Sequence, residues 1–330
     1  MTNPRSKTPW PQSERELAQV RDFNKKLAWL PRFKIRNRVL PRMIQALLRA
    51  SQIGGASQVL KHGLKAERKV IETDGVPVAV RIIRPRGRAK GVVLDFHGGG
   101  WVIGNAQMND NFNIAIVKAC DVTVVSVDYR LAVSTPIEGI MEDCVAATRW
   151  LLGEREFAGL PVIVVGESAG AHLAVATLLA LKQSPGLLPK ISGVLLYYGV
   201  YDLTGTPSVR AAPPDTLVLD GPGMVAALRM LTPDLNDEQR RQPPLSPLYG
   251  DFSGFPPALM FAGELDPLRD DTLEIAERWR TSAPVEVYQL PSSPHGFIHF
   301  PTAIANSVLA YSRGWITGQV NACTVLTSPS

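Results

Sequence analysis

The sequence has few cysteines and no long apolar run, and each absence excludes a class of protein. Three cysteines in 330 residues, Cys120, Cys144 and Cys323, are odd in number and widely spaced, which excludes a disulfide framework and indicates a reducing compartment. No stretch approaches the ~20 apolar residues of a membrane span. Residues 1–16 are polar and lack the apolar core of a signal peptide. We therefore expect a cytoplasmic protein without stable membrane association.

The sequence also lacks motifs for metals, cofactors and nucleic acids. It contains no His, Cys, Asp and Glu cluster at metal-ligand spacing, no phosphate loop and no repeat at a fixed period, so we expect no metal and no cofactor. The net charge is only +5, but residues 1–50 carry 12 Lys and Arg against 3 Asp and Glu. Because this basic segment matches no nucleic-acid motif, we interpret it as a solvated surface and expect no nucleic-acid partner.

Apolar runs and helical patterns alternate along most of the chain. Strands are expected at 69–73, 78–84, 92–96, 122–127, 162–166, 192–198, 257–263 and 285–290. Helices are expected at 110–119, 138–152, 169–182, 270–281 and 302–316. This alternation predicts an α/β fold with a mostly parallel, eight-stranded, doubly wound sheet. The first strands have no helix between them, so antiparallel pairing is expected there.

Two glycine-rich motifs follow two of these strands. Gly166-Glu167-Ser168-Ala169-Gly170 has the form of a nucleophile elbow, in which a sharp strand-to-helix turn holds a serine hydroxyl exposed beside a base. His97-Gly98-Gly99-Gly100 has the form of the loop that supplies the other half of an oxyanion hole. We expect the backbone N–H groups of Gly98, Gly99 and Ala169 to be the oxyanion donors. Together the motifs predict a serine hydrolase of the α/β-hydrolase fold.

The base and the acid of such a site should follow the serine along the chain. Of the three later histidines, His295 lies in a loop after a strand and is the expected base. His172 lies one helical turn after Ser168 and is interpreted as a packed helix residue, while His299 is a weaker alternative near the last helix. Asp266, after the strand at 257–263, is the expected acid, with Glu264 as the alternative. Asp270 and Asp271 are interpreted as helix-capping residues.

Five motifs resemble those of one family. They are His97–Gly104, Asp128–Ala132, Gly166–Gly170, Asp266–Asp270 and His295–Phe297. The stretch from residue 70 to 317 is similar to the hormone-sensitive-lipase family of carboxylesterases. This resemblance implies an ester hydrolase without a cofactor, usually acting on short-acyl esters. Carried over by position, it implies that Ser168, Asp266 and His295 form the catalytic triad and that Gly98, Gly99 and Ala169 form the oxyanion hole. Glu167 stands where the family commonly has Asp. The longer carboxylate side chain either alters a hydrogen bond behind the elbow or has no effect.

Two segments interrupt the alternation, and in this family such segments form a helical cap over the active site. We expect residues 1–55 to be the N-terminal part of the cap, with helices at 13–29 and 39–51. Residues 203–248, with a helix at 223–231, are the expected second cap segment. The catalytic domain would then comprise residues 56–202 and 249–330. Candidates for the pocket walls are Leu17, Phe23, Trp29, Leu30, Phe33, Met224, Leu228 and Leu231, although each of them also suits packing within the cap.

The expected function is hydrolysis of short- to medium-chain acyl esters by a serine carboxylesterase through an acyl-enzyme intermediate. The alternatives are an amidase or deacetylase acting on small acylated substrates, and a ligand-binding pseudo-hydrolase, which would require a broken triad. The expected partner is a small-molecule ester substrate, and a second copy of the chain in a homodimer is compatible with the sequence.

Overall fold

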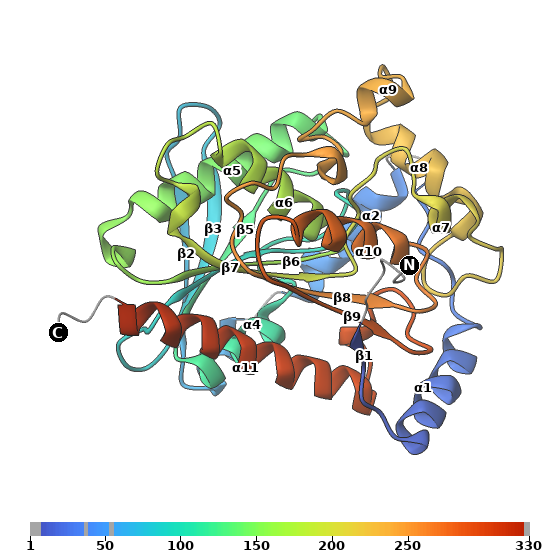
Figure 1. Ribbon diagram of the computed structural model, residues 1–330, viewed down its shortest axis with the longest axis horizontal. Coiled ribbons are helices and arrows are strands. Elements are labelled where there is room, and N and C mark those ends of the chain that lie inside the picture. The colour runs from blue at the N-terminus through green and yellow to red at the C-terminus, as the bar shows by residue number, and fades with distance from the viewer. Residues whose placement is uncertain (1–7, 36–38, 53–55, 327–330) are drawn as a thin grey trace.

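The fold is an α/β sandwich built on one central sheet (Figure 1). The structure, a computed structural model, describes residues 8–35, 39–52 and 56–326. The strands are β1 (Thr8–Pro9), β2 (Lys65–Ile71), β3 (Val78–Arg84), β4 (Val92–Phe96), β5 (Thr123–Asp128), β6 (Val162–Glu167), β7 (Ile191–Tyr197), β8 (Ala258–Gly263) and β9 (Val285–Leu290).

The sheet order is β1-β9-β8-β7-β6-β4-β5-β3-β2, and only the β2–β3 and β3–β5 pairs are antiparallel in the described part of the chain. The eight expected strands and the mostly parallel sheet are confirmed. The two-residue β1, which pairs with β9 at the edge, was not expected because two residues carry no detectable alternation. β2 begins four residues earlier than expected, since its exposed edge position allows a charged sequence with few apolar residues.

Helices cover both faces of the sheet. They are α1 (Glu14–Leu27), α2 (Val39–Ser51), α3 (Ala56–Lys61), α4 (Asp110–Cys120), α5 (Ile137–Gly153), α6 (Ala169–Leu181), α7 (Pro207–Arg210), α8 (Met224–Leu231), α9 (Asp237–Arg240), α10 (Arg269–Trp279) and α11 (Ala303–Leu326). The short 3₁₀ helices are η1 (Arg155–Phe157), η2 (Leu188–Lys190), η3 (Gly221–Gly223), η4 (Pro247–Tyr249) and η5 (Phe297–His299). None of the helices within the described ranges is long and apolar enough to cross a membrane.

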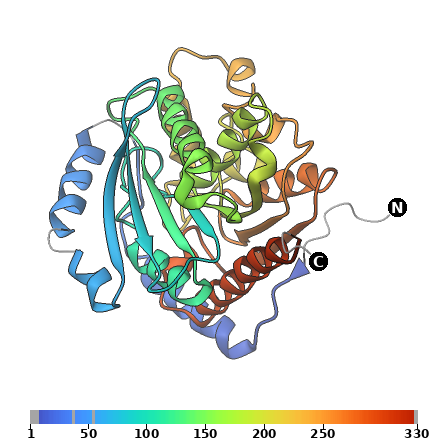
Figure 2. The same cartoon turned by 90° about the vertical axis from the view of Figure 1, so that its left-hand side faces the viewer.

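Strand residues alternate between two apolar cores, one on each face. In β4, Leu94 and Phe96 belong to the core beneath α5, α6 and α10, whereas Val93 belongs to the core beneath α4 and α11. Figure 2 shows the strands lying between the green helices α5 and α6 on one side and the red α11 on the other. Because both faces are covered, the central strands read as continuous apolar runs, which is what made them recognisable in the sequence.

Two parts of the first segment outside the alternation, residues 1–55, take different paths. Phe33 forms an isolated parallel bridge with Leu219, and its N–H donates to the carbonyl of Val218 at 2.6 Å, so residues near 33 lie beside the second segment. By contrast, α1 packs against α11, and Phe23 contacts Phe300 with ring centroids 5.1 Å apart. The assignment of residues 1–55 and 203–248 to a cap, and of 56–202 and 249–330 to a catalytic domain, stays a prediction.

Candidate active site

The turn between β6 and α6 holds Ser168 in strained backbone. Its φ of 53° and ψ of −121° lie where non-glycine residues are rare. Glycines on both sides let strand and helix pass closely, because a Cβ on Gly166 would stand 2.6 Å from the carbonyl oxygen of Gly170, and a Cβ on Gly170 would clash with that of Phe96. The predicted elbow is therefore present, with the serine at the carboxyl end of the central strand.

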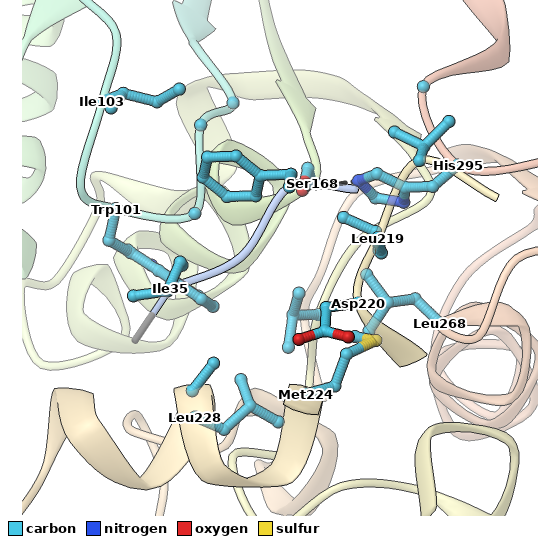
Figure 3. A pocket seen from close by; sticks show the side chains of 18 of the residues that line it. Ile35, Trp101, Ile103, Ser168, Leu219, Asp220, Met224, Leu228, Leu268 and His295 are labelled. Atoms are coloured by element: carbon cyan, nitrogen blue, oxygen red, sulfur yellow. Dashed lines mark hydrogen bonds between the residues drawn. The ribbon is translucent and has the colours of Figure 1, made fainter. Parts of the chain in front are cut away.

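The structure brings the predicted serine, histidine and aspartate together. Nε2 of His295 lies 2.9 Å from Oγ of Ser168, and its Nδ1 lies 2.8 Å from Oδ2 of Asp266 (Figure 3 shows the first contact). The Asp266 carboxylate is fully buried, and its other oxygen accepts a hydrogen bond from the N–H of Leu268 at 2.9 Å. With Nδ1–H donated to Asp266, Nε2 is free to accept the serine proton.

Glu264, the alternative acid, and two residues interpreted from the sequence as structural, His172 and Asp271, occupy positions outside the triad. Oε2 of Glu264 accepts a hydrogen bond from the N–H of Ser292 at 2.7 Å and so holds the loop before His295 instead of the imidazole itself. His172 is fully buried, and its Nε2 donates to the carbonyl of Leu245 at 2.8 Å. Asp271 accepts from the N–H groups of Tyr201 and Asp202, at 2.6 and 3.0 Å. It therefore ties α10 to the loop after β7 and does not cap the helix, whose N-cap is Leu268.

The glycine loop after β4 faces the same cavity as Ser168. Gly98 and Gly99 both line that cavity, and Gly99 has a φ of 113°, a conformation in which a Cβ would clash with the carbonyl of Ile103. Ala169 is the first residue of α6, so its N–H is among those without an intrahelical partner. The hydroxyl of Tyr129 donates to the carbonyl of His97 at 2.6 Å, which fixes the start of the loop.

The cavity has a volume of about 650 Å³ and largely apolar walls. Figure 3 shows Ile35 and Trp101 on one side, with Met224 and Leu228 of α8 across from Ser168 and His295. Of the eight candidate wall residues, four line the cavity: Phe33, Met224, Leu228 and Leu231. The other four do not line it. They lie on or just after α1, and Trp29 is 90% exposed, because that helix packs on α11 and away from the cavity.

Glu167 forms a contact that sequence reasoning missed. Its Oε2 lies 2.6 Å from Nε2 of His299 and accepts a hydrogen bond from the hydroxyl of Tyr198 at 2.8 Å. Burial alone would raise the pKa of Glu167, but the His299 charge and these hydrogen bonds lower its pKa to about 2. Burial opposes the charge of His299, yet the Glu167 carboxylate raises the pKa of this histidine above its usual value. The departure at Glu167 was visible in the sequence, whereas its pairing with residue 299 depends on the fold.

Comparisons with known proteins identify the fold and the family of the chain. Residues 93–299 match a family model described as alpha/beta hydrolase fold. The chain is 32% identical over 262 residues to carboxylesterase NlhH of Mycobacterium tuberculosis, an alignment that covers 76% of this chain and 81% of the relative. It is 30% identical over 239 residues to an arylesterase of Saccharolobus solfataricus, covering 70% of this chain and 76% of the relative.

Solved structures show the same fold over nearly the whole chain. An esterase from the archaeon Pyrobaculum calidifontis aligns with a TM-score of 0.78 at 24% identity, covering 94% of this chain and 99% of that one. Esterase LipW of Mycobacterium marinum aligns with a TM-score of 0.78 at 25% identity, covering 90% of this chain and 95% of that one. The chain therefore belongs to the α/β-hydrolase family, within the hormone-sensitive-lipase group of esterases that its motifs resemble.

Proposed function

We infer that the protein is a carboxylic ester hydrolase that uses Ser168 as its nucleophile. The observation that carries this inference is the chain of two hydrogen bonds from Ser168 through His295 to the buried Asp266, beside a glycine loop in one cavity. Relatives of the chain are named carboxylesterase, acetyl esterase and arylesterase. The proposed substrate is a small-molecule ester.

The proposed reaction proceeds by acyl transfer. Oγ of Ser168 attacks the ester carbonyl while His295 takes its proton, and Asp266 stabilises the resulting imidazolium. The N–H groups of Gly98, Gly99 and Ala169 receive the oxyanion, where each donor typically contributes ~3 kcal/mol to transition-state stabilisation. His295 then protonates the leaving alcohol and activates a water molecule that releases the acid.

The shape and lining of the cavity favour esters with short- to medium-chain acyl groups as the proposed substrates. Its walls are apolar, and α8 limits its extent opposite Ser168 through Met224, Leu228 and Leu231. The cavity wall carries few polar groups. The acyl and alcohol parts of an ester would therefore be recognised mainly by their shape. We also propose a cytoplasmic location, supported by three cysteines that are free, two of them buried.

Kinetics of Ser168→Ala and His295→Ala test the proposed nucleophile and base. With a chromogenic butyryl ester, each variant should fold and lose roughly 10³-fold or more of kcat. Retention of a tenth of the rate by either variant would overturn the assignment. A matched butyryl anilide separates the classes: preferential turnover of the anilide would make the protein an amidase.

A further inference from the structure

The carboxylate of Glu167 lies directly behind the glycine loop that faces Ser168. A Cβ on Gly98 would stand 3.3 Å from Cγ and 3.4 Å from the carboxyl carbon of Glu167. The Glu167 side chain is only 8% exposed, and it contributes to the wall of the cavity. Acyl transfer develops a negative charge at this same loop. A lone, poorly solvated carboxylate in this position would repel that charge.

His299 supplies the compensating positive charge. Among the ion pairs of the described residues, His299 is the basic partner of Glu167, at 2.6 Å, and its own side chain is about half-exposed. His299 is also among the residues that line the cavity. Its other close carboxylate, Asp95, is buried with Asn113 and Ser126 as hydrogen-bonding partners. His299 follows His295 by four residues, so one loop carries both the proposed base and the cation behind the elbow.

The same contacts also fix where the carboxylate points. The hydroxyl of Tyr198 donates to Oε2 of Glu167, and the Tyr198 ring packs edge-on against His295 with centroids 4.7 Å apart. Oε1 of Glu167 is buried and has no hydrogen-bond partner among the described residues. Loss of the His299 contact would therefore leave the charge with neutral donors alone, the Tyr198 hydroxyl and the Asn109 amide, and without the cation that neutralises it beside Gly98 and Ser168.

We propose that His299 is a positioning residue that neutralises Glu167 and holds its carboxylate away from Ser168, so that the oxyanion forms beside a neutral pair. This proposal rests on the proposed acyl transfer at Ser168. It predicts that loss of the His299 charge lowers kcat only while Glu167 carries a charge. A structural role for His299 predicts instead the same loss whichever residue stands at 167.

A double-mutant cycle in the full-length protein tests this coupling. Steady-state kinetics on a butyryl ester would compare His299→Gln, Glu167→Gln and the double variant, with the exposed His62→Gln as a matched control. Glutamine keeps a side-chain amide donor at 299 but removes the charge. We expect His299→Gln to lower kcat by about tenfold or more, with KM within about twofold, because a nearby charge in a poorly solvated site is strongly felt.

The deciding comparison is made in the Glu167→Gln background. There, adding His299→Gln should change kcat by no more than about twofold, and the double variant should be faster than His299→Gln alone. An equal loss in both backgrounds, or a loss expressed in KM alone, would overturn the proposal. If His299→Gln does not fold, as judged by circular dichroism, the Glu167→Gln and double variants still decide it: a tenfold gap between them contradicts the coupling. Failure of the proposed function would look different, because the wild type would then hydrolyse the ester no faster than Ser168→Ala.

Discussion

Nε2 of His172 lies 2.8 Å from the carbonyl oxygen of Leu245, a contact that joins the elbow helix α6 to the chain returning from the second segment. Nδ1 of the same ring accepts a hydrogen bond from the indole N–H of Trp101 at 3.3 Å. The Trp101 contact needs the neutral imidazole, because only an unprotonated Nδ1 can accept a hydrogen bond, and burial lowers the pKa of His172 to about 4. A histidine that the sequence indicated to be a packed helix residue thus links three parts of the site.

This lowered pKa predicts a loss of stability in mild acid. The stabilising contribution of neutral His172 is complete above its unfolded pKa, near 6.5, and is lost as the pH falls through about 4. Urea unfolding followed between these pH values should show the free energy of unfolding falling by up to about 3 kcal/mol from this group. His172→Phe should be less stable at neutral pH and less pH-dependent, whereas the exposed His62→Gln should follow the wild type. A wild-type slope retained in His172→Phe would contradict this origin.

Asp266→Asn should be far more damaging than Glu264→Gln. Asp266 contacts Nδ1 of His295 directly, so an amide there would favour the wrong imidazole tautomer and lower kcat by about 10³-fold or more. Glu264 contacts the N–H of Ser292, and glutamine keeps an acceptor for that bond, so its kcat should stay within about threefold. The kcat values of the two purified variants decide the point, and the reverse ranking would move the acid to Glu264.

Leu228 should limit the length of the acyl chain. It is buried on α8 and lines the cavity opposite Ser168, so Leu228→Ala would remove part of that wall. We expect wild-type kcat/KM to favour acyl chains of about eight carbons or fewer. In Leu228→Ala the octanoyl-to-butyryl ratio should rise by about fivefold. The control Leu47→Ala, on the exposed face of α2, should leave the ratio unchanged. Equal turnover of palmitoyl and butyryl esters by the wild type would contradict the proposed preference.

The first strand should contribute to stability and not to catalysis. Trp10 follows β1, is 6% exposed, and packs edge-on against Phe261, Tyr288 and Tyr311. Trp10→Ala should therefore cost about 3 kcal/mol of unfolding free energy while kcat changes little. The matched control Trp29→Ala, at a 90% exposed side chain, should stay within about 0.5 kcal/mol of the wild type. Equal stabilities of the two variants, measured by denaturant unfolding, would show that β1 is dispensable.

The sequence predicted the central strands and the elbow because each leaves a local signal. β4, β6 and β8 are buried on both faces and appear as short apolar runs, and Ser168 lies between the glycines that its turn requires. The path of α1 was not predictable in this way. Its apolar face shows that something covers it, but a periodic pattern does not distinguish α11 from the mouth of a pocket.

Long-range polar contacts left no signal at all. His299 and Glu167 are separated by 132 residues, and they meet because the loop after β9 turns back over the carboxyl end of β6. The same holds for Asp271, whose place in the first turn of α10 suggested a cap, although its oxygens reach back to residues 201 and 202. Residue type and spacing indicate which side chains carry chemistry, but their partners depend on the order of strands in the sheet.

Covalent labelling of the nucleophile tests the central claim most directly. A small phosphonate ester mimics the tetrahedral intermediate and forms a stable bond only with an activated serine. Peptide mass spectrometry of the labelled wild type should show one equivalent on the peptide that contains Ser168, with activity lost in proportion. Ser168→Ala should take up no label, and His295→Ala should take it up far more slowly. Label at another residue, or inactivation that leaves Ser168 unmodified, would contradict the account.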